Sequence, residues 1–182
     1  MIEYHKMNIF RNVTEITFDF EKDIENKFVK KVILYITEIG STFGAMAILI
    51  LTMLFGGYKI IFVFLPIYLF QLVIVETIKA LLKKPRPITD TKTNLWGLKL
   101  NSGSFPSGHT SNIFTTAFLI SNYFRFNITW TIIIFVSAGF IALSRMFLGK
   151  HYLSDIIGGA LIGITVSTLG SYILSLILPN FL

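Results

Sequence analysis

Three long runs of apolar residues constrain the fold of this chain more than any other feature. They cover residues 59–82, 127–147 and 154–178, and each is close to or longer than the ~20 residues that an α-helix needs to cross a bilayer. Backbone N–H and C=O groups in lipid must pair within their own segment, so runs of this length are helical. A membrane β-barrel would instead need alternating segments of about ten residues, and none occur. The sequence therefore predicts an all-α, multi-pass membrane helix bundle.

The composition agrees with this class and excludes several functions. Of the 182 residues, 53% are hydrophobic and only 14% are charged, whereas soluble domains are usually about 25% charged. The net charge of +6 comes from basic residues that flank the apolar runs, where they meet lipid headgroups or anionic substrates, so we expect no nucleic-acid partner. The chain has no cysteine, which excludes disulfides and thiolate metal sites.

Two further apolar segments raise the expected count to five spans. The segment 32–57 is interrupted near Glu38, Gly40 and Ser41, so we expect a helix that begins at the membrane surface and enters the bilayer near Thr42. The other segment opens at residues 106–109 and runs to residue 123. We divide the chain into a membrane-surface N-terminal segment, 1–31, and a transmembrane domain, 32–182. The first thirty residues lack an apolar core, so we expect no cleavable signal peptide.

Polar side chains gather at the ends of these spans. With five spans, the loops 83–105 and 146–153 emerge on the same side of the membrane. The residues that meet there are Lys79, Arg86, Ser107, Gly108, His109, Arg145, His151 and Asp155, together with the unassigned Lys83, Lys84 and Lys150. A cluster of cations with two histidines predicts an anion site.

Each of these residue types suits phosphate chemistry. If the chain is helical from Gly149 onward, His151 and Asp155 share a face, and the carboxylate can accept the hydrogen of one imidazole nitrogen and leave the other free. Such a histidine serves as a nucleophile or base. Ser107 can cap a helix whose first amides and dipole attract an anion, and His109 in that first turn can give or take a proton.

Together these features predict phosphoryl transfer through a phosphohistidine. His151, held by Asp155, would attack phosphorus, and His109 would protonate the leaving oxygen and then activate water. Phosphate would be bound by Lys79, Arg86, Ser107, Gly108 and Arg145, which neutralise the developing charge. We expect no metal or other cofactor, because the cations supply that charge and one carboxylate is too few for a divalent cation.

The same residues form a recognisable three-part pattern. Lys79 is followed after six residues by Arg86-Pro87, then Pro106-Ser107-Gly108-His109, then Ser144-Arg145, five residues, His151, three residues and Asp155. This pattern resembles the signature of the type 2 phosphatidic acid phosphatase family, which includes the vanadium haloperoxidases. The resemblance runs from about residue 28 to the C-terminus. It implies an integral-membrane, metal-independent lipid phosphatase in which the residues have the roles given above.

The resemblance also raises two questions of topology. Many members of the family have six spans, and here a charged N-terminal segment stands in place of the first, so six spans is the alternative to five. About fourteen of the sixteen lysines and arginines share the side of the site, which the positive-inside rule would assign to the cytoplasm. The resemblance to the family instead implies that the site lies on the outer face of the membrane. Several of these cations are expected substrate ligands, and we therefore expect an extracytoplasmic site.

Three functions remain open on sequence grounds. The first is hydrolysis of a lipid phosphate or diphosphate, of the polyprenyl diphosphate class or the phosphatidylglycerophosphate and phosphatidate class. We expect a pocket open to the bilayer, with Trp96, Leu98 or Leu100 against the lipid chain. The second is transfer of the phosphate to another lipid or a sugar. The third is non-catalytic anion binding or transport, which needs neither the His151–Asp155 pair nor His109.

Overall fold

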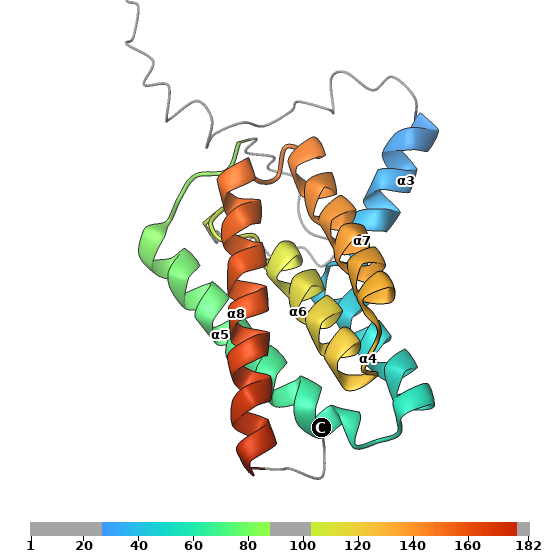
Figure 1. Cartoon of the computed structure of the whole chain (residues 1–182). Helices are drawn as coiled ribbons and strands as arrows, with labels where there is room; N and C mark the ends of the chain where they lie inside the picture. Colours follow the sequence, from blue (N-terminus) through green and yellow to red (C-terminus); the bar gives the residue numbers. More distant parts are fainter. Residues whose placement is uncertain (1–26, 88–102, 178–182) are drawn as a thin grey trace, which may run out of the picture.

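The computed structural model describes residues 27–87 and 103–177, and all regular secondary structure in these ranges is α-helical (Figure 1). This confirms the all-α class. Most of the N-terminal segment and the predicted lipid contacts Trp96, Leu98 and Leu100 lie outside the described residues. The helices are α3 (Lys27–Glu38), α4 (Thr42–Gly56), α5 (Ile60–Leu82), α6 (Gly108–Tyr123), α7 (Ile128–Phe147) and α8 (Leu153–Ile177).

Three of these helices are individually long and apolar enough to cross a membrane. α5, α7 and α8 contain 18-residue windows with mean hydropathies of 2.2, 1.8 and 1.8. α3 and α4 meet the same test together, as one segment bent by 60°. The described chain therefore has three clear spans, or four with the bent pair. The remaining predicted span is α6, which has only 16 residues.

The break between α3 and α4 lies where the sequence predicted it. α3 ends at Glu38, and the Gly40 N–H donates to the Thr37 carbonyl at 3.0 Å. Ser41 then caps α4, because its hydroxyl accepts from the Gly44 N–H at 3.0 Å. A new cap after three non-helical residues starts a helix in a new direction.

α6 lies in the centre of the bundle, packed against α4, α5, α7 and α8 (Figure 1). Its buried residues include Thr110, Ser111 and Thr115. Their hydroxyls find partners inside the bundle: Gln71 Nε2 of α5 donates to Ser111 Oγ at 2.8 Å, and Thr115 Oγ1 donates to the Gly163 carbonyl at 3.2 Å. Because its neighbours shield it from lipid, α6 can be shorter and more polar than a lipid-exposed span.

Two glycines of α8 allow close approach to α6. A Cβ atom at Gly159 would lie 2.6 Å from the Ser107 carbonyl oxygen, and one at Gly163 would lie 2.6 Å from that of Ser111. No side chain fits at such distances from backbone. The close helix packing expected from the small-xxx-small pair is therefore present, with α6 as the partner.

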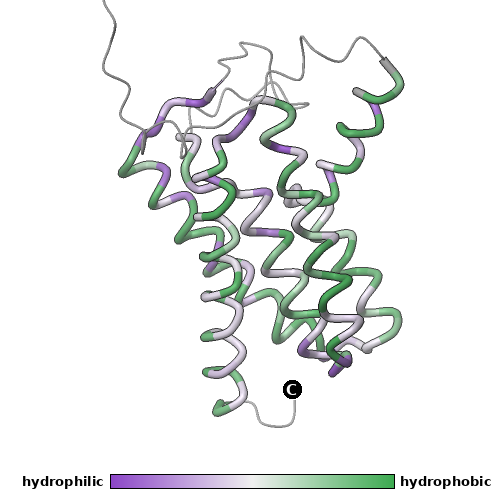
Figure 2. Tube along the Cα trace, turned by 45° about the horizontal axis from the view of Figure 1, so that its top comes forward, coloured by the Kyte–Doolittle hydropathy of each residue, from purple (hydrophilic) through white to green (hydrophobic). Residues whose placement is uncertain are grey.

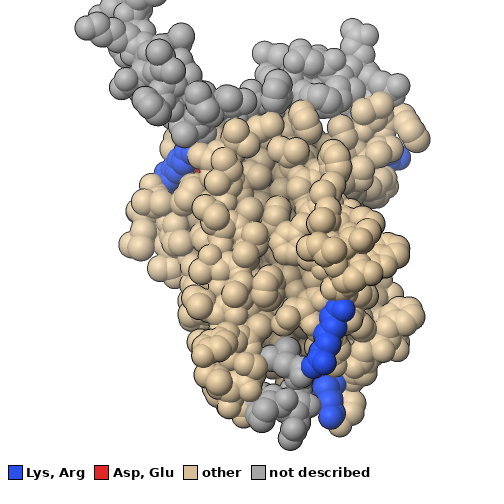
Figure 3. All heavy atoms as spheres, viewed as in Figure 1, with Lys and Arg blue, Asp and Glu red and all other residues tan. Residues whose placement is uncertain are grey.

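The outer surface of the bundle is apolar over most of its height. Large hydrophobic side chains that are at least 67% exposed occur on five helices, α3, α4, α5, α7 and α8; they include Tyr35, Leu54, Phe55, Leu81, Ile128, Phe140 and Leu176. Hydrophilic stretches gather at the end where α5 stops and α8 starts, with a smaller group at the opposite end (Figure 2). On the face shown in Figure 3, the Lys and Arg side chains of the described residues lie near the two ends. This distribution fits a multi-pass membrane protein.

The α6–α8 contact can be tested with a matched pair of glycine substitutions. Gly163→Ala should destabilise the protein by about 1–3 kcal/mol, because the methyl group must push two backbones apart. Gly139→Ala in α7 should leave stability unchanged or slightly higher, since a Cβ there meets nothing within 4 Å. Thermal unfolding of the purified protein in detergent measures both, and equal melting temperatures for the two variants would contradict the close packing.

Candidate active site

Three stretches that are distant in the sequence meet at one end of the bundle: the end of α5, the start of α6 and the turn between α7 and α8 (Figure 1). The Ser107 N–H donates to the Asp155 carbonyl at 3.0 Å. A Cβ at Gly108 would lie 3.3 Å from Lys79 Nζ. The charges of Arg86 and Arg145 act on His151. The structure therefore brings the residues of all three sequence motifs into one cluster.

His151 is buried in the turn that precedes α8, not in the helix itself. Gly149, with φ of 61°, turns the chain, and α8 begins only at Leu153. The condition that the chain is helical from Gly149 onward is therefore not met. The ring Nδ1 lies 2.9 Å from the Ser104 carbonyl oxygen and 3.6 Å from Asp155 Oδ2. The nearer acceptor is thus a backbone carbonyl that sequence reasoning missed, and Asp155 is the more distant of the two.

The contact with Ser104 determines the tautomer of His151. A carbonyl oxygen can only accept, so a nitrogen 2.9 Å away must carry the hydrogen. The hydrogen is therefore on Nδ1, and the lone pair is on Nε2. Burial lowers the pKa of His151 to about 4, and the charges of Arg145 and Arg86 act in the same direction, against the opposing effect of Asp155. The imidazole is neutral and oriented at neutral pH.

Asp155 is fully buried, and both its carboxylate oxygens have partners. Oδ2 accepts from the Tyr152 N–H at 3.0 Å, so the side chain caps the start of α8 from the third helical position. Oδ1 accepts from Lys84 Nζ at 2.8 Å. Lys84 matches no position of the three-part pattern. In the sequence, only its position two residues before Arg86 indicates that it lies near the site. The structure makes it the counter-charge of Asp155.

The start of α6 has the predicted cap with one change. Ser107 is the N-cap residue, and its hydroxyl accepts from the Thr110 N–H at 3.4 Å. The Ser107 N–H, however, is bonded to the Asp155 carbonyl and is not free for an anion. The first-turn amides without an intrahelical partner are those of Gly108 and His109, so these two, and not the amide of Ser107, are available to the predicted anion.

The cationic side chains surround this helix start. Lys79 is buried and donates to Glu76 Oε1 at 2.6 Å. Arg145 donates from Nη1 to Thr37 Oγ1 at 3.2 Å, while its Nε is buried without a hydrogen-bond partner among the described residues. Burial lowers the pKa of Arg86, against the opposing charges of Asp155 and Glu76. A buried donor without a partner is costly, so Arg145 is suited to bind an anion.

His109 is the second residue of α6 and is partly buried. It lies within electrostatic range of His151 and of all three predicted phosphate-binding cations, Lys79, Arg86 and Arg145. The second histidine therefore shares the cluster with the first.

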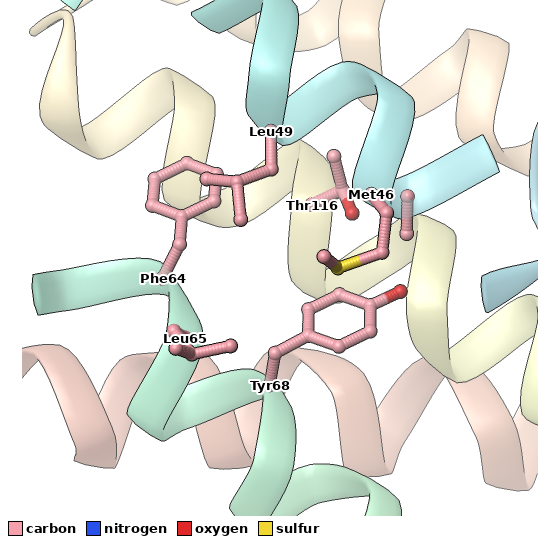
Figure 4. A pocket seen from close by; sticks show the side chains of 7 residues that line it. Met46, Leu49, Phe64, Leu65, Tyr68 and Thr116 are labelled. Carbon is pink, nitrogen blue, oxygen red and sulfur yellow. The ribbon is translucent and has the colours of Figure 1, made fainter. Parts of the chain in front are cut away.

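Two other features of the described residues bear on ligand binding. A small apolar hollow between α4, α5 and α6 contains none of the predicted site residues (Figure 4); it is lined by Ala45, Met46, Leu49, Phe64, Leu65, Tyr68 and Thr116. Within residues 27–87 and 103–177, no three His, Asp or Glu side chains are grouped so as to hold a metal ion.

Solved structures with the same fold include two bacterial proteins. The PAP2-type phosphatidylglycerolphosphate phosphatase of Bacillus subtilis aligns with a TM-score of 0.66 and 21% identity, over 92% of this chain and 87% of that one. LpxE of Aquifex aeolicus aligns with a TM-score of 0.65 and 26% identity, over 84% of this chain and 92% of that one. At 21% identity, the match to the Bacillus subtilis structure shows only that the two proteins share a fold.

Two curated relatives from Porphyromonas gingivalis are more similar over a shorter stretch. Its lipid A 1-phosphatase is 35% identical over 77 residues, and its lipid A 4′-phosphatase is 35% identical over 78 residues. Each match covers 42% of this chain, but only 17% and 32% of the respective relatives.

The family comparison covers most of the chain. The model of the PAP2 superfamily matches residues 48–177, which include all three motifs, four of the six described helices in full and the larger part of α4. The predicted family is thereby confirmed: this chain belongs to the PAP2 superfamily.

Proposed function

We propose that this chain is a membrane lipid phosphatase that forms a phosphohistidine on His151. The observation that carries the proposal is the state of His151: a buried, neutral imidazole whose Nδ1–H is directed at the Ser104 carbonyl, so that Nε2 bears the lone pair. The neighbouring guanidinium groups and the start of α6 support an anionic substrate at this nitrogen. The phosphatase activities named for the relatives agree with this chemistry.

In the first step, His151 Nε2 attacks phosphorus. The N–P bond forms as the bond between phosphorus and the lipid oxygen breaks, and the leaving oxygen takes the electron pair together with a proton from His109. Lys79, Arg86 and Arg145 stabilise the charge on the other phosphate oxygens, with the amides of Gly108 and His109. These cations supply the positive charge that a metal ion would otherwise provide.

In the second step, His109 accepts a proton from water, and the water oxygen attacks the phosphorus of the phosphohistidine. The N–P bond breaks, its electron pair returns to Nε2, and inorganic phosphate leaves. The Nδ1–H bond to Ser104 holds the ring in one orientation through both steps, so that His151 is regenerated in its initial tautomer.

The proposed substrate is a lipid with a terminal phosphomonoester or diphosphate. The chain is multi-pass and the site lies at one end of the bundle, where the phosphate of a membrane lipid is found. We favour the phosphatidylglycerophosphate and phosphatidate class or the polyprenyl diphosphate class. Phosphate release from a panel of these lipids and lipid A distinguishes them, and transfer to an added lipid or sugar instead of water would support the phosphotransferase alternative.

The two histidines should differ in a substrate-dependent way. His151→Ala should abolish turnover of both a lipid monophosphate and an activated aryl phosphate, since the covalent route is lost. His109→Ala should lose roughly 100- to 10,000-fold on the lipid, whose alkoxide needs a proton to leave, and less on the aryl phosphate. Phosphate release by the purified variants measures this, with labelled phosphohistidine as a second readout. Equal losses on both substrates, with no trapped intermediate, would contradict separate roles.

Removal of metal ions should leave the activity intact. EDTA should change phosphate release by less than about twofold, because Lys79, Arg86 and Arg145 neutralise the transferred group. Vanadate should inhibit, since it adopts the pentacoordinate geometry of the transition state. Loss of activity in EDTA that magnesium restores would contradict the proposed mechanism.

We further propose that the site faces the extracytoplasmic side, since several cations that would otherwise signal a cytoplasmic side are used on substrate. The chain has no cysteine of its own, which allows a direct test. Lys83→Cys at the site end should react with a membrane-impermeant maleimide in intact cells. Tyr58→Cys, in the turn at the opposite end, should react only after permeabilisation. The reverse pattern would place the site in the cytoplasm.

A further inference from the structure

Lys84 forms hydrogen bonds with both residues whose oxygens face Nδ1 of His151, through other atoms of those residues. Its Nζ donates to Asp155 Oδ1 at 2.8 Å and to Ser154 Oγ at 2.8 Å. Its backbone carbonyl accepts from the Ser104 N–H at 2.8 Å. Ser104 and Asp155 are the residues whose oxygens lie 2.9 and 3.6 Å from Nδ1. One residue thus holds the two groups that orient the imidazole, one through its side chain and one through its backbone.

The ammonium group of Lys84 is itself fixed in place. Besides its two hydrogen bonds, Nζ lies 4.4 Å from the centroid of the Tyr152 ring and 6.0 Å from that of Phe105. Both distances fall within the range of cation–π attraction. The side chain is 27% exposed, while that of Asp155 is fully buried. Lys84 therefore points into the scaffold behind His151, in contrast to Arg145, whose Nε has no hydrogen-bond partner among the described residues.

The charge of Lys84 matters because Asp155 is buried. A carboxylate without a counter-charge in such a place is unfavourable and seeks another proton or cation. Apart from Lys84, the titratable group in contact with the carboxylate is His151, whose Nδ1 lies 3.6 Å from Oδ2. With Lys84 present, Oδ1 is neutralised by the ammonium, and the imidazole can remain unprotonated next to the carboxylate.

We propose that Lys84 is a positioning residue that holds Ser104 and Asp155 against His151 and keeps the nucleophile neutral. The inference rests on the proposed role of His151. It assigns to Lys84 an effect on the rate of phosphoryl transfer and none on phosphate binding.

Loss of the Lys84 charge should alter catalysis in two ways. A misplaced imidazole lowers kcat by roughly 10- to 100-fold, because small displacements of a nucleophile are costly. We expect the acid limb of the wild-type pH–rate profile near pH 4, because burial lowers the pKa of His151 to about 4, and in the variant this limb should move to higher pH. The reason is that Asp155 then favours the imidazolium more strongly. The other charged or titratable groups around His151 are unchanged in the variant: Arg145 from α7, Arg86 after α5 and His109 from α6.

The test compares four variants of the full-length protein, purified in detergent, on dioctanoyl phosphatidate. Lys84→Met should lower kcat with KM within about twofold of the wild type, and should shift the acid limb upward. Lys84→Arg, which retains the charge, should keep the wild-type acid limb and recover part of kcat. Lys83→Met removes the same charge one position earlier, where the side chain is exposed, and should match the wild type. His151→Gln should be inactive.

Several outcomes would overturn the inference. A raised KM with unchanged kcat in Lys84→Met would make Lys84 a phosphate ligand instead. A wild-type kcat and pH profile would leave it without a role. Equal losses in Lys84→Met and Lys84→Arg, both with lower melting temperatures, would make it a structural residue only. Activity in His151→Gln would contradict the proposed function itself, which separates the two failures. If Lys84→Met does not fold, Lys84→Gln, uncharged but still a donor, takes its place.

Discussion

The rest of the site depends on the interactions of one buried group, the carboxylate of Asp155. It caps the first turn of α8 through the Tyr152 N–H and takes its counter-charge from Lys84 after α5. The backbone carbonyl of Asp155 accepts a hydrogen bond from the Ser107 N–H at the start of α6. One residue thus ties three helix ends together. The residues of the candidate site lie at the ends of separate helices, so hydrogen bonds that join these ends are needed to fix their relative positions.

Much of this arrangement could be predicted from the sequence, because membrane helices leave strong signals. Apolar length located α5, α7 and α8, and the Ser107 cap located the start of α6. The spacing of the polar residues at the helix ends then implied one cluster. The contacts that orient His151 could not be predicted in the same way. The acceptor nearest Nδ1 is the Ser104 backbone carbonyl. Every residue has a backbone carbonyl, so the residue type at this position does not indicate the contact.

The role of Lys84 illustrates a second limit of sequence reasoning. Three cations lie close together after α5, and nothing in their identity separates Lys83, which is exposed, from Lys84, which pairs with Asp155. The difference arises from the left-handed conformation of Lys83, with φ of 46°, which ends α5 and redirects the chain. Lys84 then lies in a non-helical segment, where its backbone carbonyl accepts a hydrogen bond from the Ser104 N–H. Which lysine meets the carboxylate is decided by this local geometry.

The central position of α6 has a consequence for how the protein is made. A 16-residue helix with buried Thr110, Ser111 and Thr115 has too little apolar length and too many hydroxyls to be held in lipid by its own hydropathy. Its stability at that depth comes from packing against α4, α5, α7 and α8, and the last two of these are synthesised after it. We therefore expect the membrane integration of this chain to be cooperative rather than sequential, with the first turn of α6 packed in place only after α8 has entered the bilayer.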